Sequence, residues 1–124
     1  MVTAITEGVK VCVETFYQPD TNPYYTFAYR VTIINDSPYE VQLMRRHWYI
    51  YDSIHFYREV EGEGVIGEQP VLEPGEEHTY VSGCHLKTDI GRMHGYYEMR
   101  KKDSQKRFKV TIPSFVLLPS SKMN

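Results

Sequence analysis

Cysteine is scarce in this chain, with only two among 124 residues, too few for a disulfide framework. We therefore expect Cys12 and Cys84 to be free thiols in a reduced, cytoplasmic protein. Long apolar runs are also absent, and none approaches the roughly 20 residues that a membrane span requires. The first residues show no basic segment followed by an apolar one. We therefore expect neither a membrane anchor nor a secretory signal.

The chain also lacks an excess of either positive or negative charge. The net charge is −2, with 14 basic and 16 acidic residues interspersed. This balance argues against a nucleic-acid-binding protein. The length fits one domain that needs no metal or disulfide to fold. We assign residues 1–118 to that domain and residues 119–124 to a flexible tail.

Catalytic and metal-binding signatures are missing too. The sequence has no G-x-S-x-G elbow, no phosphate-loop lysine and no H-E-x-x-H pair. Cys84 and His85 are adjacent, so on a strand they point to opposite faces and form no dyad. The five histidines are not spaced as a metal site, which leaves only weak binding of a divalent cation open. They are His47, His55, His78, His85 and His94. We expect no enzyme activity, no cofactor and no dedicated metal site.

The chain is rich in tyrosine, and its apolar and polar residues alternate. Eleven tyrosines and five phenylalanines favour strands over helices. Apolar residues recur with period two, and turn signals separate the segments. The expected strands cover residues 9–13, 25–34, 41–52, 57–60, 78–82, 93–101 and 108–115. A type II turn is expected at Pro74-Gly75 and another turn at Asp103-Ser104. The pattern predicts an all-β protein, a β-sandwich or a small barrel.

The expected strand over residues 41–52 carries the main basic cluster. Alternation puts Met44, Trp48 and Ile50 on one side, with Trp48 in the core. It puts Arg45, His47 and Tyr49 on the other side. Arg46 shares the side of Trp48, and we favour a structural role for it, bonded to carbonyls or to a carboxylate such as Asp52.

The segment Gly62-Glu63-Gly64-Val65-Ile66-Gly67 has the form of a dinucleotide-binding loop, G-x-G-x-x-G. Such a loop binds phosphate when a helix follows it, but here two prolines follow and exclude a helix. Two alternatives remain. The backbone of Gly62, Gly64 and Gly67 binds a phosphate together with Arg45 and His47, with a cation offsetting the acidic surroundings. Otherwise the glycines provide backbone geometry for a bulge or turn, which we favour.

Several strings occur together in one order and spacing over residues 24–118. They are Arg46-His47-Trp48-x-Ile50-x-Asp52, Gly62-x-Gly64-Val65-Ile66-Gly67-x-Gln69-Pro70, Leu72-x-Pro74-Gly75-Glu76, Tyr80-x-Ser82-Gly83, Gly91-x-Met93-x-Gly95-x-Tyr97-x-Met99 and Phe108-x-Val110-x-Ile112-Pro113-x-Phe115. With these strings the chain resembles the ApaG family of small bacterial proteins. The resemblance implies a fibronectin type III or immunoglobulin-like β-sandwich of about seven to eight strands and no settled catalytic activity. Similar domains in eukaryotic F-box and polymerase-interacting proteins suggest an attached binding module.

The chain departs from the family pattern in two loops. Ser53-Ile54-His55-Phe56 stands where a glycine-bearing hairpin turn is usual, and Thr88-Asp89 replaces a Thr-Pro pair. These changes concern loop shape rather than the fold.

The tyrosines outnumber what one small core can hold. They are Tyr24, Tyr25, Tyr49, Tyr51, Tyr57 and Tyr96. They fit a protein-binding surface or cross-strand pairs that stabilise the sheet, and both alternatives stay open. Our first hypothesis is a protein–protein interaction module with an unidentified partner, or a homodimer through a strand edge. The alternative is a nucleotide- or pyrophosphate-binding protein that uses the glycine segment.

Overall fold

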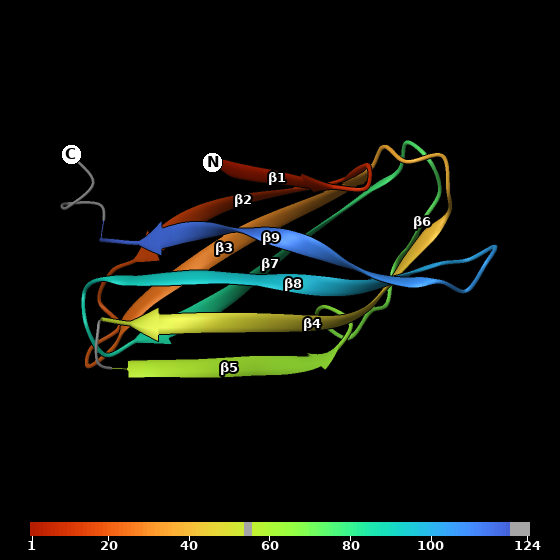
Figure 1. Cartoon of the computed structure of the whole chain (residues 1–124). Coiled ribbons are helices and arrows are strands. Elements are labelled where there is room, and N and C mark those ends of the chain that lie inside the picture. The colour runs from red at the N-terminus through yellow and green to blue at the C-terminus, as the bar shows by residue number, and fades with distance from the viewer. Residues whose placement is uncertain (54–55, 120–124) are drawn as a thin grey trace.

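The protein is a sandwich of two antiparallel sheets (Figure 1). The computed structural model describes residues 1–53 and 56–119, which form nine strands. They are β1 (Val2–Thr6), β2 (Val9–Gln18), β3 (Tyr25–Asn35), β4 (Val41–Asp52), β5 (Phe56–Glu63), β6 (Val71–Leu72), β7 (Glu77–Leu86), β8 (Gly91–Lys101) and β9 (Arg107–Leu117). No described segment is a helix of the length and apolarity that a membrane crossing requires. The expected tail, apart from Pro119, and His55 lie outside the described residues.

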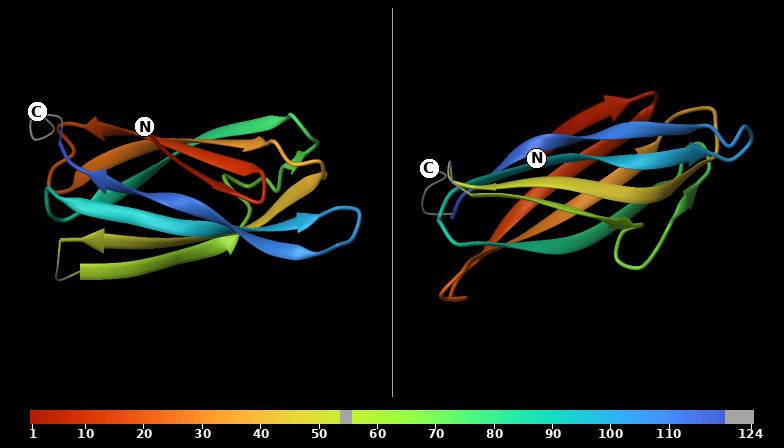
Figure 2. Two further views of the ribbon diagram at one scale, coloured as in Figure 1. Left: turned by 45° about the horizontal axis from the view of Figure 1, so that its top comes forward. Right: turned by 60° about the horizontal axis from the view of Figure 1, so that its bottom comes forward.

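One sheet has the strand order β1-β2-β3-β7 and the other β5-β4-β8-β9, with β6 added to the start of β4. On one side of the sandwich β1 contacts β9, so the two sheets meet there. On the opposite side the edge strands are β7 and β5. Figure 2 shows this arrangement from two further directions. The sandwich is therefore closed along β1 and β9 and bordered by β5 and β7 along the other side.

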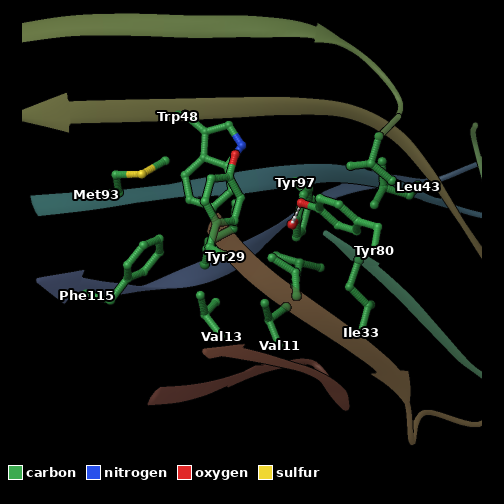
Figure 3. Close-up of a cluster of buried hydrophobic side chains, with 14 of the residues drawn as sticks. Val11, Val13, Tyr29, Ile33, Leu43, Trp48, Tyr80, Met93, Tyr97 and Phe115 are labelled. Atoms are coloured by element: carbon green, nitrogen blue, oxygen red, sulfur yellow. Dashed lines mark hydrogen bonds between the residues drawn. The ribbon is translucent and has the colours of Figure 1, made fainter. Parts of the chain in front are cut away.

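Alternating side chains from both sheets fill the core. Val11, Val13 and Ile33 come from the four-stranded sheet, and Trp48 and Tyr97 face them from the other (Figure 3). The Tyr80 and Tyr97 hydroxyls hydrogen-bond to each other in this apolar interior. Burial raises the pKa of both phenols, so both stay neutral and each depends on the other as a partner.

Two buried polar side chains, Asn35 and Asp52, hydrogen-bond to neighbouring segments at opposite ends of the sandwich. The Asn35 amide donates to the carbonyls of Tyr39 at 2.7 Å and Leu72 at 2.9 Å and accepts from the Ser37 hydroxyl at 2.6 Å. The Asp52 carboxylate accepts the backbone N–H of Lys87 at 2.6 Å and of Thr88 at 3.1 Å. Each side chain satisfies loop groups that burial would otherwise leave unpaired.

The sandwich, the core position of Trp48 and the Pro74-Gly75 turn are confirmed. Gly75 has φ +90°, and the Glu76 N–H donates to the Glu73 carbonyl at 2.9 Å. The sequence did not indicate the short strands β1 and β6. The placement of Met44 on the same side of the strand as Trp48 was wrong, because a β-bulge shifts the register between Leu43 and Arg45. Leu43 is buried at that position instead.

Candidate functional site

The glycine segment begins at the end of β5, with Gly62 and Glu63, and continues into a tight hairpin turn after that strand. The Val65 N–H donates to the Glu68 carbonyl at 2.8 Å, and the Glu68 N–H donates to the Val65 carbonyl at 3.0 Å. Between them, Ile66 and Gly67 have φ values of 48° and 73°. Two consecutive positive φ values are the mark of a type I′ turn. The Gly64 N–H donates to the Met44 carbonyl at 2.9 Å, so the Gly64 and Val65 amides of this segment are already bonded within the protein.

Each glycine of the segment meets a local requirement. Gly64 has φ +61°, and a Cβ there would lie 2.1 Å from the Glu68 carbonyl oxygen. Gly67 has φ +73° but open space around it. At Gly62, within β5, a Cβ would lie 2.9 Å from Nη1 of Arg46. Backbone geometry at Gly64 and Gly67, and the neighbouring guanidinium at Gly62, account for these residues.

Arg45 and His47, the other two residues of the predicted phosphate site, do not converge with the three glycines. His47 faces outward from β4, whereas Gly62 on β5 faces the inner side, where it meets Arg46. Arg45 lies opposite Glu63 and Glu98 in the register of the sheet. The structure therefore does not gather Arg45 and His47 with Gly62, Gly64 and Gly67 around one point. Phosphate binding by these five residues stays a prediction.

Arg46 lies at the core margin, as its expected structural role requires. Its Nη1 donates to the carbonyls of Glu63 at 3.0 Å and Gly64 at 3.1 Å. These bonds tie β4 to the base of the hairpin. The carboxylate considered as its partner, Asp52, instead binds the loop at Lys87 and Thr88.

The outer surface of the five-stranded sheet carries a cluster of stacked rings, which we call the aromatic face. His47 stacks on Tyr96 with centroids 5.0 Å apart, and Tyr49 stacks on His94 at 4.9 Å. Tyr51 lies 5.1 Å from Tyr57. These contacts join neighbouring strands, because His47 opposes Tyr96, Tyr49 opposes His94 and Tyr51 opposes Tyr57 in the register. The aromatic face consists of His47, Tyr49, Tyr51, Tyr57, His94 and Tyr96.

Acidic side chains border the aromatic face along β5. Nε2 of His47 lies 2.7 Å from Glu59, and Nδ1 lies 3.1 Å from Glu61. Hydrogen bonds from His47 and Tyr57 hold the pKa of Glu59 below its usual range. Desolvation, followed by the bond to Glu59, raises the pKa of Tyr57 to about 12. With both ring nitrogens facing carboxylates, His47 is a poor ligand for a phosphate.

Cations already lie over two of these rings. The Arg92 guanidinium is 4.8 Å from the centroid of Tyr51, and the Lys109 ammonium is 4.6 Å from the centroid of Tyr96. These distances are typical of cation–π contacts. Desolvation and, second, the Arg92 charge lower the pKa of His94. The rings of this surface therefore accept positive charge from the solvent side.

A hollow of about 460 Å³ adjoins the aromatic face at Tyr51 and Arg92. Its apolar lining includes Ile90 and Val116, which are 49% and 50% exposed. The aromatic face thus continues into an apolar depression at one end.

The strand alternation brings together residues that the sequence alone did not connect. Tyr49, Tyr51, Tyr57 and Tyr96 were expected as surplus tyrosines. The stacking of Tyr49 and Tyr51 on His94 depends on the pairing of β4 with β8, and the contact of Tyr51 with Tyr57 depends on the pairing of β4 with β5. Both alternatives for the tyrosines remain compatible with this geometry, since rings paired across strands also present an outer surface. Tyr24 and Tyr25 lie apart from the cluster, with Tyr24 beside His85 and Tyr25 packed against the core.

Cys84 and His85, the adjacent pair considered as a dyad, both lie on β7. Cys84 is buried while His85 is exposed and bonds to Thr26, so the pair does face opposite sides. Burial raises the pKa of the Cys84 thiol, which disfavours the nucleophilic thiolate. Within residues 1–53 and 56–119, no three His, Cys, Asp or Glu side chains are arranged to hold a metal ion.

Comparisons with known proteins give a consistent result. A family model described as the ApaG domain matches residues 16–101. Protein ApaG of Brucella canis is 46% identical over 122 residues, which cover 94% of this chain and 92% of that protein. Protein ApaG of Brucella melitensis is 45% identical with the same coverage.

Solved structures agree with the sequence relatives. The structural genomics target SoR45 is 34% identical with a TM-score of 0.89 and covers 98% of this chain and 94% of its own. A Bordetella pertussis protein is 39% identical with a TM-score of 0.86, covering 90% of this chain and 94% of its own. A β-glucuronidase from Bacteroides uniformis has a TM-score of 0.51 at 12% identity, covering 84% of this chain and 14% of its own. That last likeness concerns the fold alone.

Proposed function

This chain belongs to the ApaG family, and we propose that it is a non-enzymatic interaction module whose aromatic face binds a basic segment of another protein. The observation that carries the proposal is the ring cluster of His47, Tyr49, Tyr51, Tyr57, His94 and Tyr96 on the outside of the sheet. Tyrosine offers a large contact area at a small cost in conformational entropy. The cross-strand stacking holds the rings in place before a partner arrives, which lowers that cost further.

The charge bordering the rings supports a basic partner. The Glu59 and Glu61 side chains are 45% and 62% exposed although both contact His47. A lysine or arginine of the partner would reach these carboxylates from the solvent side. Its charge would also lie near Tyr49, as Arg92 already lies over Tyr51. Electrostatic contacts of this kind add specificity and speed association.

The free thiols of Cys12 and Cys84 fit the cytoplasm as the compartment of this interaction. The high pKa of the Cys84 thiol fits a protein without a cysteine nucleophile. A homodimer through the edge of β5 or β7 is the competing form of association. The mass of the protein in solution distinguishes it from a complex with another protein.

The experiment is affinity capture from the native cell with variants matched in charge. Glu61→Lys reverses a charge beside the aromatic face, and Tyr96→Ala removes one of its rings. Glu77→Lys makes the same charge reversal at an exposed position on β7 in the other sheet. We expect one specific partner with wild type and Glu77→Lys, and its loss by at least about tenfold with Glu61→Lys and Tyr96→Ala. Equal recovery with all four proteins would refute the proposal.

A further inference from the structure

A second site lies between the sheets, on the side bordered by β5 and β7. The cleft there has a volume of about 470 Å³, within the usual range for small-molecule sites. Trp48 and Tyr29 lie side by side on its apolar floor, with Met93 close by (Figure 3). The cleft is separate from the aromatic face, because it is lined by the inner side of β4 and β5.

Two arginines from neighbouring strands line this cleft. Arg46 on β4 uses Nη1 to bind the carbonyls of Glu63 and Gly64. Arg58 on β5 uses Nη2 to bind the His85 carbonyl at 2.8 Å. Within the described ranges 1–53 and 56–119, neither guanidinium has a carboxylate within 4.0 Å. Carbonyls orient both groups, and the part of the chain that the structure describes pairs neither positive charge with a carboxylate.

The guanidinium geometry defines what the cleft would accept. Each guanidinium has five N–H donors in a planar fork, and the bonds above use one nitrogen of each. The remaining donors match the oxygens of a carboxylate or a phosphate. The Ser82 hydroxyl lines the same cleft as Tyr29 and adds a polar group on the β7 wall.

Part of the glycine segment forms the wall of the cleft at its hairpin end. Val65, Ile66 and Gly67 line the cleft as part of the hairpin. The Val65 N–H is bonded within that hairpin, so charge recognition falls to Arg46 and Arg58. The segment closes one end of the cleft and does not have to cradle a phosphate.

We propose that the cleft between β5 and β7 binds a small organic anion, with its carboxylate or phosphate on Arg46 and Arg58 and its flat apolar body on Tyr29 and Trp48. The anionic group of the ligand matches the two guanidinium groups, and its apolar body matches the two aromatic rings. The volume admits a ligand of one or two rings, and the charged group stays near the solvent-exposed side, since Arg58 is exposed. This site requires no partner protein and stands independently of the aromatic face.

The test uses Trp48, the only tryptophan of the chain, as the reporter. Phenylacetate, phenyl phosphate and neutral phenylacetamide are titrated at fixed ionic strength while its fluorescence is followed. We expect saturable binding of at least one anion, with the neutral amide at least about tenfold weaker. Which anion binds more tightly identifies the preferred head group.

Arg58→Gln is the decisive variant, because Arg58 is exposed and on an edge strand, so the fold should persist. We expect it to weaken anion binding at least about tenfold. Arg30→Gln is the matched control, because Arg30 is on β3, where it pairs with Glu14 outside the cleft. No saturable change with either anion, equal binding of the neutral amide, or equal weakening by both variants would each overturn the proposal.

Discussion

Replacing Gly64 with alanine should destabilise the protein much more than the same change at Gly67. Both residues have positive φ, which costs a residue with a Cβ about 1 kcal/mol. Only at Gly64 would the new Cβ also meet the backbone, 2.1 Å from the Glu68 carbonyl oxygen. Both alanine substitutions therefore carry the cost of a positive φ, and only Gly64→Ala adds a collision with the backbone.

The collision sets the size of the difference. The Glu68 carbonyl accepts the Val65 N–H at 2.8 Å, and the reciprocal bond measures 3.0 Å. Moving that carbonyl away from a Cβ weakens both bonds, at about 0.5–1.5 kcal/mol each. Gly64→Ala should cost about 2–4 kcal/mol in total, Gly67→Ala about 1 kcal/mol, and Gly67→Asn within about 0.5 kcal/mol, since asparagine tolerates positive φ.

Urea unfolding followed by Trp48 fluorescence measures these free energies. With a slope of about 2 kcal/mol per molar, the midpoint should fall by about 1–2 M for Gly64→Ala and about 0.5 M for Gly67→Ala. Equal midpoints for the two alanine variants would refute the assignment of Gly64 to close backbone packing.

Three further outcomes follow from other parts of the structure. Asn35→Ala should lower the free energy of unfolding by about 3 kcal/mol, because it abandons buried carbonyls and a buried hydroxyl, while exposed Asp36→Ala stays within about 0.5 kcal/mol in the same urea assay. Tyr80→Phe and Tyr97→Phe should each cost about 1–3 kcal/mol by leaving the other hydroxyl unpaired, and the double variant should cost less than their sum; strict additivity in a double-mutant cycle would contradict the pairing. Because the pKa of His94 is lowered in the folded protein, the unfolded chain binds more protons below its ordinary pKa of about 6.5, and stability should fall as the pH drops from about 7.5 to 5.5. Thermal unfolding across that range should show a smaller loss for His94→Phe, and an unchanged loss would contradict the assignment.

The fold could be predicted because alternation and turn chemistry are local signals. Val9, Val11 and Val13 indicate an inward face, and Pro74-Gly75 indicates its turn, without knowledge of the partner strands. The bulge between Leu43 and Arg45 could not be predicted in this way. Its effect is to change which of Leu43 and Met44 points inward, and both are apolar, so hydrophobicity does not distinguish them.

The candidate sites depend on pairing between distant strands. Tyr49 and His94 are far apart in sequence and meet only because β4 pairs with β8. Arg46 and Arg58 line one cleft because both point to the inner side of adjacent strands, although the strand over residues 57–60 gave no sign of an inward-facing arginine. The conformation of the glycine segment was easier to predict, because the prolines after it excluded the helix that follows a dinucleotide-binding loop. Its hairpin conformation agrees with that exclusion.

Site-specific photocrosslinking in the native cell tests the interaction proposal most directly. A photoreactive benzoylphenylalanine replaces Tyr49 on the aromatic face or, as the control, Thr32 on β3 in the opposite sheet. The proposal predicts a discrete crosslinked protein from position 49, absent from position 32 and lost when Glu61→Lys is added. The same crosslinked protein from both positions, or none from position 49, would contradict it.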